Sequence, residues 1–182
     1  MAKRALHLLA TGFEEIEAVS IADVLRRAGV EVVLASLDEL FVRGAHNIAI
    51  KADILLAEVD ESIFDVVILP GGLPGAYTLA QSPLVQKTLQ YFDAQKKMIG
   101  AICAAPLALK MAGVLKNAYT CYPSFETQIE HQGYQKEPKV VCDGNITTSQ
   151  GPATSILFAL KLVEQLCGEK VSLQLKKDLL LD

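Results

Sequence analysis

The chain has 182 residues, of which 51% are apolar, and it carries a net charge of −4. This size predicts a single domain spanning residues 1–182, with a sizeable core. The acidic balance argues against nucleic acid or an anionic membrane surface as partner, because both favour basic patches. No apolar run is long enough to span a bilayer, and Glu14 and Glu15 stand where a secretory cleavage site would belong. We therefore expect a cytoplasmic protein.

The predicted elements alternate along the chain. The predicted strands are Arg4–Ala10, Glu31–Ser36, Phe64–Leu69, Met98–Ile102 and Lys139–Cys142. The predicted helices are Ile16–Ala28, Pro83–Ala94, Ala105–Ala112, Pro152–Leu166 and, on a weaker pattern, Ser124–Glu130. Residues Asp38–Lys51 are predicted to form a short hairpin at the sheet edge. Near-continuous apolar strands followed by helices indicate an α/β fold with a mostly parallel sheet between two helical layers.

A carboxylate lies on the apolar face of the first predicted helix. At 100° per residue, Glu17 falls between Val24 and Ala28, so it is aimed inward. A buried carboxyl group must be paired or keep its proton, because an unpaired buried charge is costly. Glu14 lies near the same stripe, but its place in the turn before the helix favours a structural role at the helix dipole.

Glycines follow the strand that ends at Leu69. Residues Pro70–Gly75 read PGGLPG, and such a turn lets backbone N–H groups approach a developing negative charge. An ordinary tight turn is the alternative interpretation. The stretch is not GxGxxG and no P-loop lysine follows, so no nucleotide site is predicted.

The stretch Met98–Pro106, MIGAICAAP, joins a buried strand to a helix through Cys103. Because Pro106 is preset for a first helical turn, the thiol is predicted at the N-terminal end of that helix. Free N–H groups and the helix dipole stabilise an anion there, and the thiolate is the reactive form of cysteine. The pattern is typical of a nucleophile or redox site, and a buried structural cysteine is the alternative. Since parallel strands end at one edge, Glu17 and Cys103 are expected to meet.

The other cysteines suggest no further site. Cys121, Cys142 and Cys167 are widely spaced and the chain has no CxxC pair, so neither a zinc site nor a disulfide framework is predicted. This cysteine usage suits a reducing compartment. No metal and no cofactor is expected.

Four motifs occur in the order ATGFEEIEAV, FDVVILPGGLPGA, MIGAICAAPLAL and TTSQGPATS. With them the chain resembles the ThiJ/PfpI superfamily, and within it the clade of the human Parkinson disease protein seven, from Lys3 to about Leu180. The resemblance implies a homodimer whose subunit is a flavodoxin-like three-layer sandwich with a mostly parallel central sheet and a cysteine nucleophile elbow.

The resemblance also assigns roles to residues. It implies that Cys103 is the oxidisable nucleophile, that Glu17 is a protonated acid hydrogen-bonded to it, and that Gly72 and Ala104 supply backbone N–H groups beside the sulfur. The expected site lining is completed by Glu14, Gly71, Tyr122 and Gln150.

Two of these positions depart from the pattern of the superfamily. Tyr122 stands where many relatives have a histidine, which removes a general base. Gln150 stands where relatives often have an arginine, which removes a positive charge. Both departures weaken the expectation of efficient glyoxalase chemistry and leave oxidation of the thiol untouched.

Two functions remain open from the sequence. The first is cysteine-dependent action on small reactive carbonyls of the methylglyoxal class, glyoxalase-like or deglycase-like, with Cys103 as nucleophile and Glu17 as proton shuttle. The second is a non-enzymatic oxidative-stress sensor or chaperone switched by oxidation of Cys103 to sulfinic acid. A glutamine amidotransferase is rejected because that class needs a His-x-Glu motif after the cysteine, and His131 does not begin one. A protease is rejected because the protease branch of the superfamily has a histidine directly after the cysteine, where this chain has Ala104.

Overall fold

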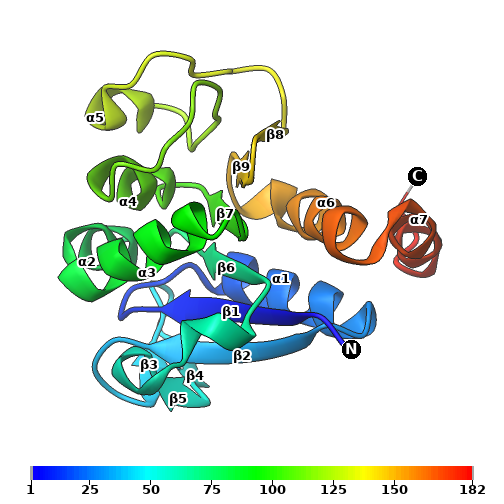
Figure 1. The fold of residues 1–182 in the computed structure, drawn as a ribbon, viewed down its shortest axis with the longest axis horizontal. Coiled ribbons are helices and arrows are strands. Elements are labelled where there is room, and N and C mark those ends of the chain that lie inside the picture. Colours follow the sequence, from blue (N-terminus) through cyan, green and yellow to red (C-terminus); the bar gives the residue numbers. More distant parts are fainter. Residues whose placement is uncertain (1, 182) are drawn as a thin grey trace.

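A seven-stranded sheet forms the centre of the computed structural model, which describes residues 2–181 (Figure 1). Its strand order is β5-β2-β1-β6-β7-β9-β8, and only the β8–β9 pair is antiparallel. The strands of this sheet are β1 (Arg4–Leu9), β2 (Glu31–Ser36), β5 (Ile54–Leu55), β6 (Val66–Leu69), β7 (Met98–Ile102), β8 (Val140–Asp143) and β9 (Ile146–Ser149). The run β2-β1-β6-β7-β9 has the flavodoxin-like order, so the predicted fold class is confirmed.

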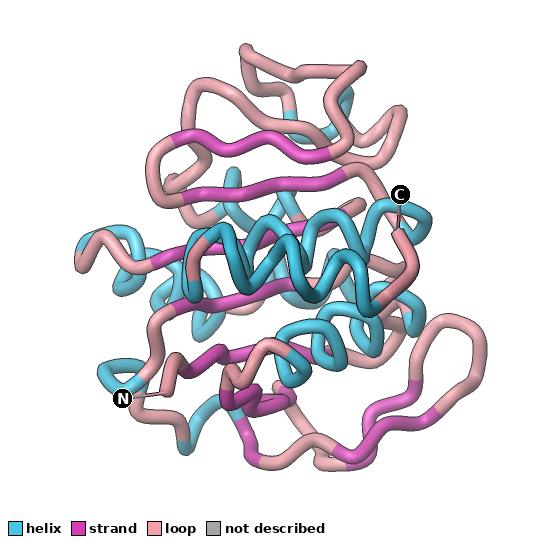
Figure 2. The backbone as a smooth tube through the Cα atoms, turned by 90° about the vertical axis from the view of Figure 1, so that its right-hand side faces the viewer, coloured by secondary structure: helices cyan, strands magenta, loops and turns pink. Residues whose placement is uncertain are grey.

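Helices cover both faces of the sheet (Figures 1 and 2). They are α1 (Glu15–Arg27), α2 (Gly75–Gln81), α3 (Pro83–Ala94), α4 (Pro106–Met111), α5 (Glu126–Ile129), α6 (Ser155–Cys167) and α7 (Glu169–Asp178). The apolar cluster under α1, α6 and α7 fills one face, and the cluster under α3 and α4 fills the other. Each strand of the central pair β1 and β6 is buried on both faces, which explains its unbroken apolar sequence.

The predicted hairpin forms, but as a sheet of its own. Strands β3 (Phe41–Arg43) and β4 (Ala49–Lys51) pair only with each other, and the edge strand beside β2 is β5. The hairpin packs on the loop after β1, where the N–H of Gly12 donates to the carbonyl of Arg43 at 2.7 Å. The hairpin therefore lies over the start of α1, close to the carboxyl edge of the sheet.

Four strands or helices were not predicted from the sequence, namely β5, β9, α2 and α7. Strand β9 has the polar sequence ITTS but is fully buried. Its threonine hydroxyls can be buried because they find hydrogen-bond partners inside the protein: Oγ1 of Thr148 accepts the N–H of Thr120 at 2.9 Å. Helix α2 begins within the PGGLPG turn, and α7 follows α6 directly after Gly168, which we expected only as a helix stop.

Several predicted boundaries are also corrected. The strand predicted from Phe64 begins at Val66, and the one predicted at 139–142 runs antiparallel as β8. The helix predicted from Pro152 begins at Ser155, because residues Pro152–Thr154 form a 3-10 turn. The order β1, α1, β2 and the step from β7 to α4 follow the predicted alternation, and α3 has the predicted bounds. None of the helices found between residues 2 and 181 combines the length and the apolar character needed to cross a bilayer.

Candidate functional site

Cys103 lies in a sharp turn between β7 and α4. Its backbone has φ 64°, a left-handed conformation that a residue with a side chain adopts at a cost of about 1–3 kcal/mol. The turn is held by the N–H of Cys103, which donates to Ser149 at 3.0 Å, and by Ala105, which donates to Ile102 at 3.0 Å. Pro106 opens the helix, as predicted. The result is an elbow that aims the cysteine side chain out of the strand at the carboxyl edge of the sheet.

The loop after β6 lies against this elbow. Gly71 lies against both side chains of the site. A methyl group on its Cα would stand 2.6 Å from Cβ of Cys103, 2.9 Å from Sγ of Cys103 and 2.9 Å from Oε2 of Glu17. Gly72 has φ 89°, and a side chain there would collide with the backbone of Phe13 and Glu14. Position 71 requires glycine because there is no space for a side chain. Position 72 requires it for space and also for its left-handed backbone conformation.

Glu17 and Cys103 meet across Gly71, as the sequence predicts. The buried Glu17 carboxyl accepts the N–H of Gly71 on Oε2 at 2.6 Å, whereas Oε1 has no well-aligned hydrogen-bond partner among residues 2–181. Burial raises the pKa of Glu17 to about 7, the charge of Glu14 adds to the rise, and interactions with Gly71 and Cys103 oppose it. The carboxyl therefore keeps its proton over much of the range below neutral pH.

The Cys103 thiol shares its titration with Glu17. Burial raises the pKa of the thiol, the charge of ionised Glu17 raises it further, and the backbone N–H groups of Gly72 and Ala104 lower it. Two neighbouring anions are unfavourable, so the two acids lose their protons as a coupled pair. The thiolate predicted from the sequence thus depends on Glu17 holding its proton. The sulfur is accessible but only slightly, because Cys103 is 9% exposed.

Glu14 caps α1 and stands beside the pair. Its Oε2 accepts the N–H of Glu17 at 2.7 Å, which agrees with the structural role predicted for it. Its negative charge also raises the pKa of Glu17. Glu14 therefore both fixes the first turn of α1 and disfavours ionisation of Glu17.

Tyr122 and Gln150 occupy the two positions that depart from the superfamily pattern. The N–H of Tyr122 donates to the carbonyl of Cys103 at 2.9 Å, and its ring lies over Gly151 with 47% of the residue exposed. The Gln150 side chain instead ties down the preceding loop: it donates to Lys136 at 2.6 Å and accepts from Lys139 at 3.1 Å. The structure thus brings Tyr122 beside the elbow, whereas the side-chain hydrogen bonds of Gln150 within residues 2–181 are with residues 136–139.

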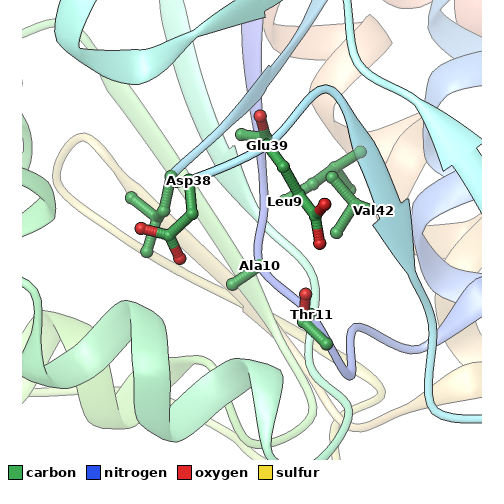
Figure 3. Close-up of a pocket in the computed structure, with 8 residues that line it drawn as sticks. Leu9, Ala10, Thr11, Asp38, Glu39 and Val42 are labelled. Atoms are coloured by element: carbon green, nitrogen blue, oxygen red, sulfur yellow. The ribbon is translucent and has the colours of Figure 1, made fainter.

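A small hollow opens where β1 and β2 end (Figure 3). In Figure 3 the carboxylates of Asp38 and Glu39 point in different directions. The lining contains neither Cys103 nor Glu17; it comprises Leu9, Ala10, Thr11, Ser36, Leu37, Asp38, Glu39 and Val42. This hollow is separate from the elbow.

One polar residue near the site escaped the sequence analysis. His46 lies in the β3–β4 turn and contacts Glu15, whose Oε2 is 2.9 Å from Nδ1, and Glu14, whose Oε1 is 3.8 Å away. The sequence offered no periodic signal for this contact, because it joins a hairpin turn to a helix start 31 residues earlier.

Comparisons with known proteins show the family to which the chain is related. The DJ-1/PfpI family profile matches residues 3–165. The chain is 42% identical to Protein dj-1beta of Drosophila melanogaster, with 99% of this chain and 98% of that one covered, and 41% identical to the Parkinson disease protein 7 homolog of Danio rerio, with 98% and 97% covered.

Two further similarities concern structure and activity. The crystal structure of Drosophila melanogaster DJ-1beta superposes with a TM-score of 0.96 at 42% identity, with both chains fully covered. A Caenorhabditis elegans relative named glutathione-independent glyoxalase DJR-1.2 is 36% identical, with 92% of this chain and 90% of that one covered. With a strained cysteine elbow, a facing buried glutamate and these full-length similarities, the chain belongs to the DJ-1/PfpI family.

Proposed function

We propose that this protein converts small reactive carbonyl compounds of the methylglyoxal class, with Cys103 as nucleophile and Glu17 as proton shuttle. The observation that carries the proposal is the meeting of a cysteine in a strained elbow with a buried carboxyl group whose pKa is raised to about 7. A group with a pKa near the working pH can both give and accept a proton. The relative named as a glutathione-independent glyoxalase supports the same chemistry.

The reaction starts with attack of the sulfur on the aldehyde carbon of methylglyoxal. A C–S bond forms, the carbonyl π-electrons move to oxygen, and the Oε1–H of Glu17 protonates that oxygen to give a hemithioacetal. The N–H groups of Gly72 and Ala104 face the sulfur and supply hydrogen bonds to negative charge there during the attack. Oε1 is suited to carry the mobile proton, because Oε2 is already occupied by Gly71.

The remaining steps balance without an oxidant or reductant. The Glu17 carboxylate takes the proton from the former aldehyde carbon and returns it to the neighbouring carbon, while the hydroxyl proton moves from the first oxygen to the former ketone oxygen, so that the hemithioacetal becomes a thioester of lactate. Water then cleaves the C–S bond, which releases lactate, restores the thiolate and yields two protons, one of which returns to Glu17. The sum is methylglyoxal plus one water giving lactate and one proton. A glycated thiol or amine would present a related carbon to the same sulfur, which is the deglycase-like form of the proposal.

The test is lactate formation from methylglyoxal by the purified protein without glutathione. The unaltered chain and Cys121→Ser are expected to produce lactate, whereas Cys103→Ser is expected to fall to the uncatalysed rate. Cys121 is the matched control because it is a second buried cysteine. Lactate formation by Cys103→Ser at the same rate as the unaltered chain would refute the proposal.

A redox sensor is the second candidate, and the placement of the sulfur favours it. An oxygen added to Sγ would lie among the donors that act on the sulfur, namely the N–H groups of Gly72 and Ala104 and the protonated carboxyl of Glu17. These donors stabilise a sulfinate more than a neutral thiol. If Cys103→Ser and the unaltered chain both fail to form lactate, while peroxide adds two oxygen atoms to Cys103, this second function is favoured.

We also propose that the protein is a homodimer. Two apolar side chains, Ile16 and Val19, stand on the outer face of α1 with 57% and 51% of each residue exposed. Ile48 is equally exposed and lies beside them, because its N–H contacts Glu15 at the start of α1. Such a patch is typical of a surface that another chain covers. Sedimentation of the unaltered chain as a monomer at micromolar concentration would contradict this.

A further inference from the structure

The end of β9 holds the elbow by its backbone. Ser149 is the last residue of β9 and pairs with Ile102, the last residue of β7. The carbonyl of Ser149 accepts the N–H of Cys103 at 3.0 Å, so this hydrogen bond lies just beyond the paired strands. The position of that carbonyl therefore helps to set the direction in which the chain turns at the cysteine.

Two hydroxyl groups inside the protein fix the loop that follows. Ser149 is fully buried and Thr154 is 7% exposed. Oγ of Ser149 donates to the carbonyl of Lys139 at 2.7 Å and lies 2.7 Å from Oγ1 of Thr154. Oγ1 of Thr154 also accepts the N–H of Gly151 at 3.1 Å and donates to the carbonyl of the same residue at 2.8 Å. The two hydroxyls thus connect the segment before β8, the end of β9 and the turn before α6.

These two hydroxyls have two hydrogens for three oxygen contacts. The contacts are those with the carbonyls of Lys139 and Gly151, and the one between the hydroxyls themselves. With the Ser149 hydrogen given to Lys139, the Thr154 hydrogen is shared between Gly151 and Ser149. Because a hydroxyl both donates and accepts, removal of the one on Thr154 leaves buried polar groups without their hydrogen bonds. The network therefore holds its members in one arrangement.

The same loop reaches the elbow a second time, through Tyr122. The N–H of Tyr122 donates to the carbonyl of Cys103 at 2.9 Å, and a methyl group on Gly151 would stand 3.2 Å from Cδ2 of the tyrosine ring. The N–H of Cys103 is thus held by one residue of the network, and its carbonyl by a residue that packs on another. A cysteine with φ 64° keeps this conformation only while its surroundings fix it.

We propose that Thr154 is a positioning residue for Cys103. Its hydroxyl holds Ser149 and Gly151, and these hold the elbow in the conformation that keeps the sulfur beside backbone N–H groups. Those N–H groups lower the pKa of the thiol, which favours the reactive thiolate. Without the Thr154 hydroxyl the elbow can relax, the sulfur loses part of this stabilisation, and the thiolate forms only at higher pH.

The role of Thr154 is independent of the substrate. Both functions proposed above begin at the sulfur of Cys103, and the reactivity of that thiol can be measured alone. A protein that forms no lactate would therefore leave this inference standing. Ser149 and Thr154 are buried within one chain, so a second copy of the chain is not needed to complete the network.

The experiment measures alkylation of Cys103 by iodoacetamide in the full chain between about pH 5 and about pH 10. Mass spectrometry of the peptide that carries it distinguishes this thiol from Cys121, Cys142 and Cys167. Thr154→Val removes the hydroxyl at nearly constant volume. We expect its alkylation rate at neutral pH to fall at least about tenfold and its pH profile to move about one unit upward, since a tenfold loss of thiolate corresponds to one pKa unit.

Two further variants test the physical reason. Thr154→Ser keeps the hydroxyl and is expected to stay within about twofold of the unaltered chain. Thr147→Val is the matched control, because Thr147 is a second buried threonine of the same region, and its hydroxyl donates to Gln165 at 3.0 Å instead of to the loop. Its pH profile is expected to stay in place even where the variant is less stable.

Circular dichroism establishes that each variant is folded. If Thr154→Val does not fold, Ser149→Ala takes its place, because it removes the other hydroxyl and keeps the carbonyl that accepts the N–H of Cys103. The proposal is overturned if the folded variant without the hydroxyl is alkylated within about twofold of the unaltered chain at every pH. It is also overturned if Thr154→Ser loses as much as Thr154→Val, or if Thr147→Val shows the same shift.

Discussion

Glu17, in the first turn of α1, accepts the backbone N–H of Gly71 at 2.6 Å, and Gly71 in turn lies against the sulfur of Cys103. Residues far apart in the sequence are joined here at a single backbone amide. The arrangement leaves one oxygen of Glu17 for a proton and leaves no room for a side chain at position 71.

Gly71→Ala should disrupt the site by steric conflict. The new methyl group would stand 2.6–2.9 Å from the Cys103 side chain and from Oε2 of Glu17, so one of the two side chains must move. We expect lactate formation to fall at least about tenfold, since an ångström-scale displacement of reacting groups costs up to about a hundredfold. Gly144→Ala is the control for backbone strain without steric conflict, because Gly144 has φ 59° and a methyl group there meets nothing within 4 Å. Equal rates for both variants would argue against the Gly71 contact.

Glu17→Gln should abolish proton transfer while keeping the shape of the side chain. The amide can still accept the N–H of Gly71 on its oxygen. Because general acid–base catalysis contributes about 10²–10⁴-fold, we expect a loss of that order in kcat/KM for methylglyoxal. The measurement is the initial rate of lactate release, with circular dichroism to show that the fold persists. A rate within twofold of the unaltered chain would remove Glu17 from the mechanism.

Tyr122→His should restore a base beside the elbow. The N–H of Tyr122 donates to the carbonyl oxygen of Cys103, so the backbone at this position lies beside the elbow. An imidazole with a pKa near 6.5 accepts protons at neutral pH, which a phenol does not. We expect lactate formation to rise severalfold, and Tyr122→Phe to stay within about twofold of the unaltered chain. A large loss with Tyr122→Phe would instead show that the phenol hydroxyl takes part.

His7 should make the protein less stable in acid. It is fully buried in β1, neither ring nitrogen has a partner among residues 2–181, and burial lowers its pKa to about 3. Between pH 6.5 and 3 the unfolded chain therefore binds a proton that the folded chain excludes. This residue's contribution to stability is present above pH 6.5 and is lost as the pH falls, by up to about 1.4 kcal/mol per pH unit.

His7→Leu is the corresponding variant. It should gain stability relative to the unaltered chain, and the gain should grow by about 2 kcal/mol between pH 6.5 and pH 5. Urea unfolding at several pH values measures it, and His131→Leu, a partly exposed histidine, serves for comparison. If the unfolding free energies of His7→Leu and the unaltered chain keep a constant difference across this range, the buried histidine is not the cause of the acid sensitivity.

The sequence by itself determined the alternation of strands and helices and the two central residues of the site, Glu17 and Cys103. Apolar runs predict the parallel strands because both faces of such a strand are buried, and the inward-facing Glu17 is evident from helical periodicity. Cys103 was marked by the strand, the small residues and Pro106 that surround it. These signals are local, so they survive without knowledge of the fold.

Tertiary structure decided what local signals cannot contain. Strand β9 is polar in sequence and buried only because its threonines find partners on other segments, and α2 and α7 follow residues that locally favour turns or stops. The coupling of Glu17 with Cys103 depends on the common edge of the sheet, which brings distant loops together. The contact of His46 with Glu14 and Glu15 was absent from any pattern, because side chains from a hairpin and a helix start become neighbours only when the chain has folded.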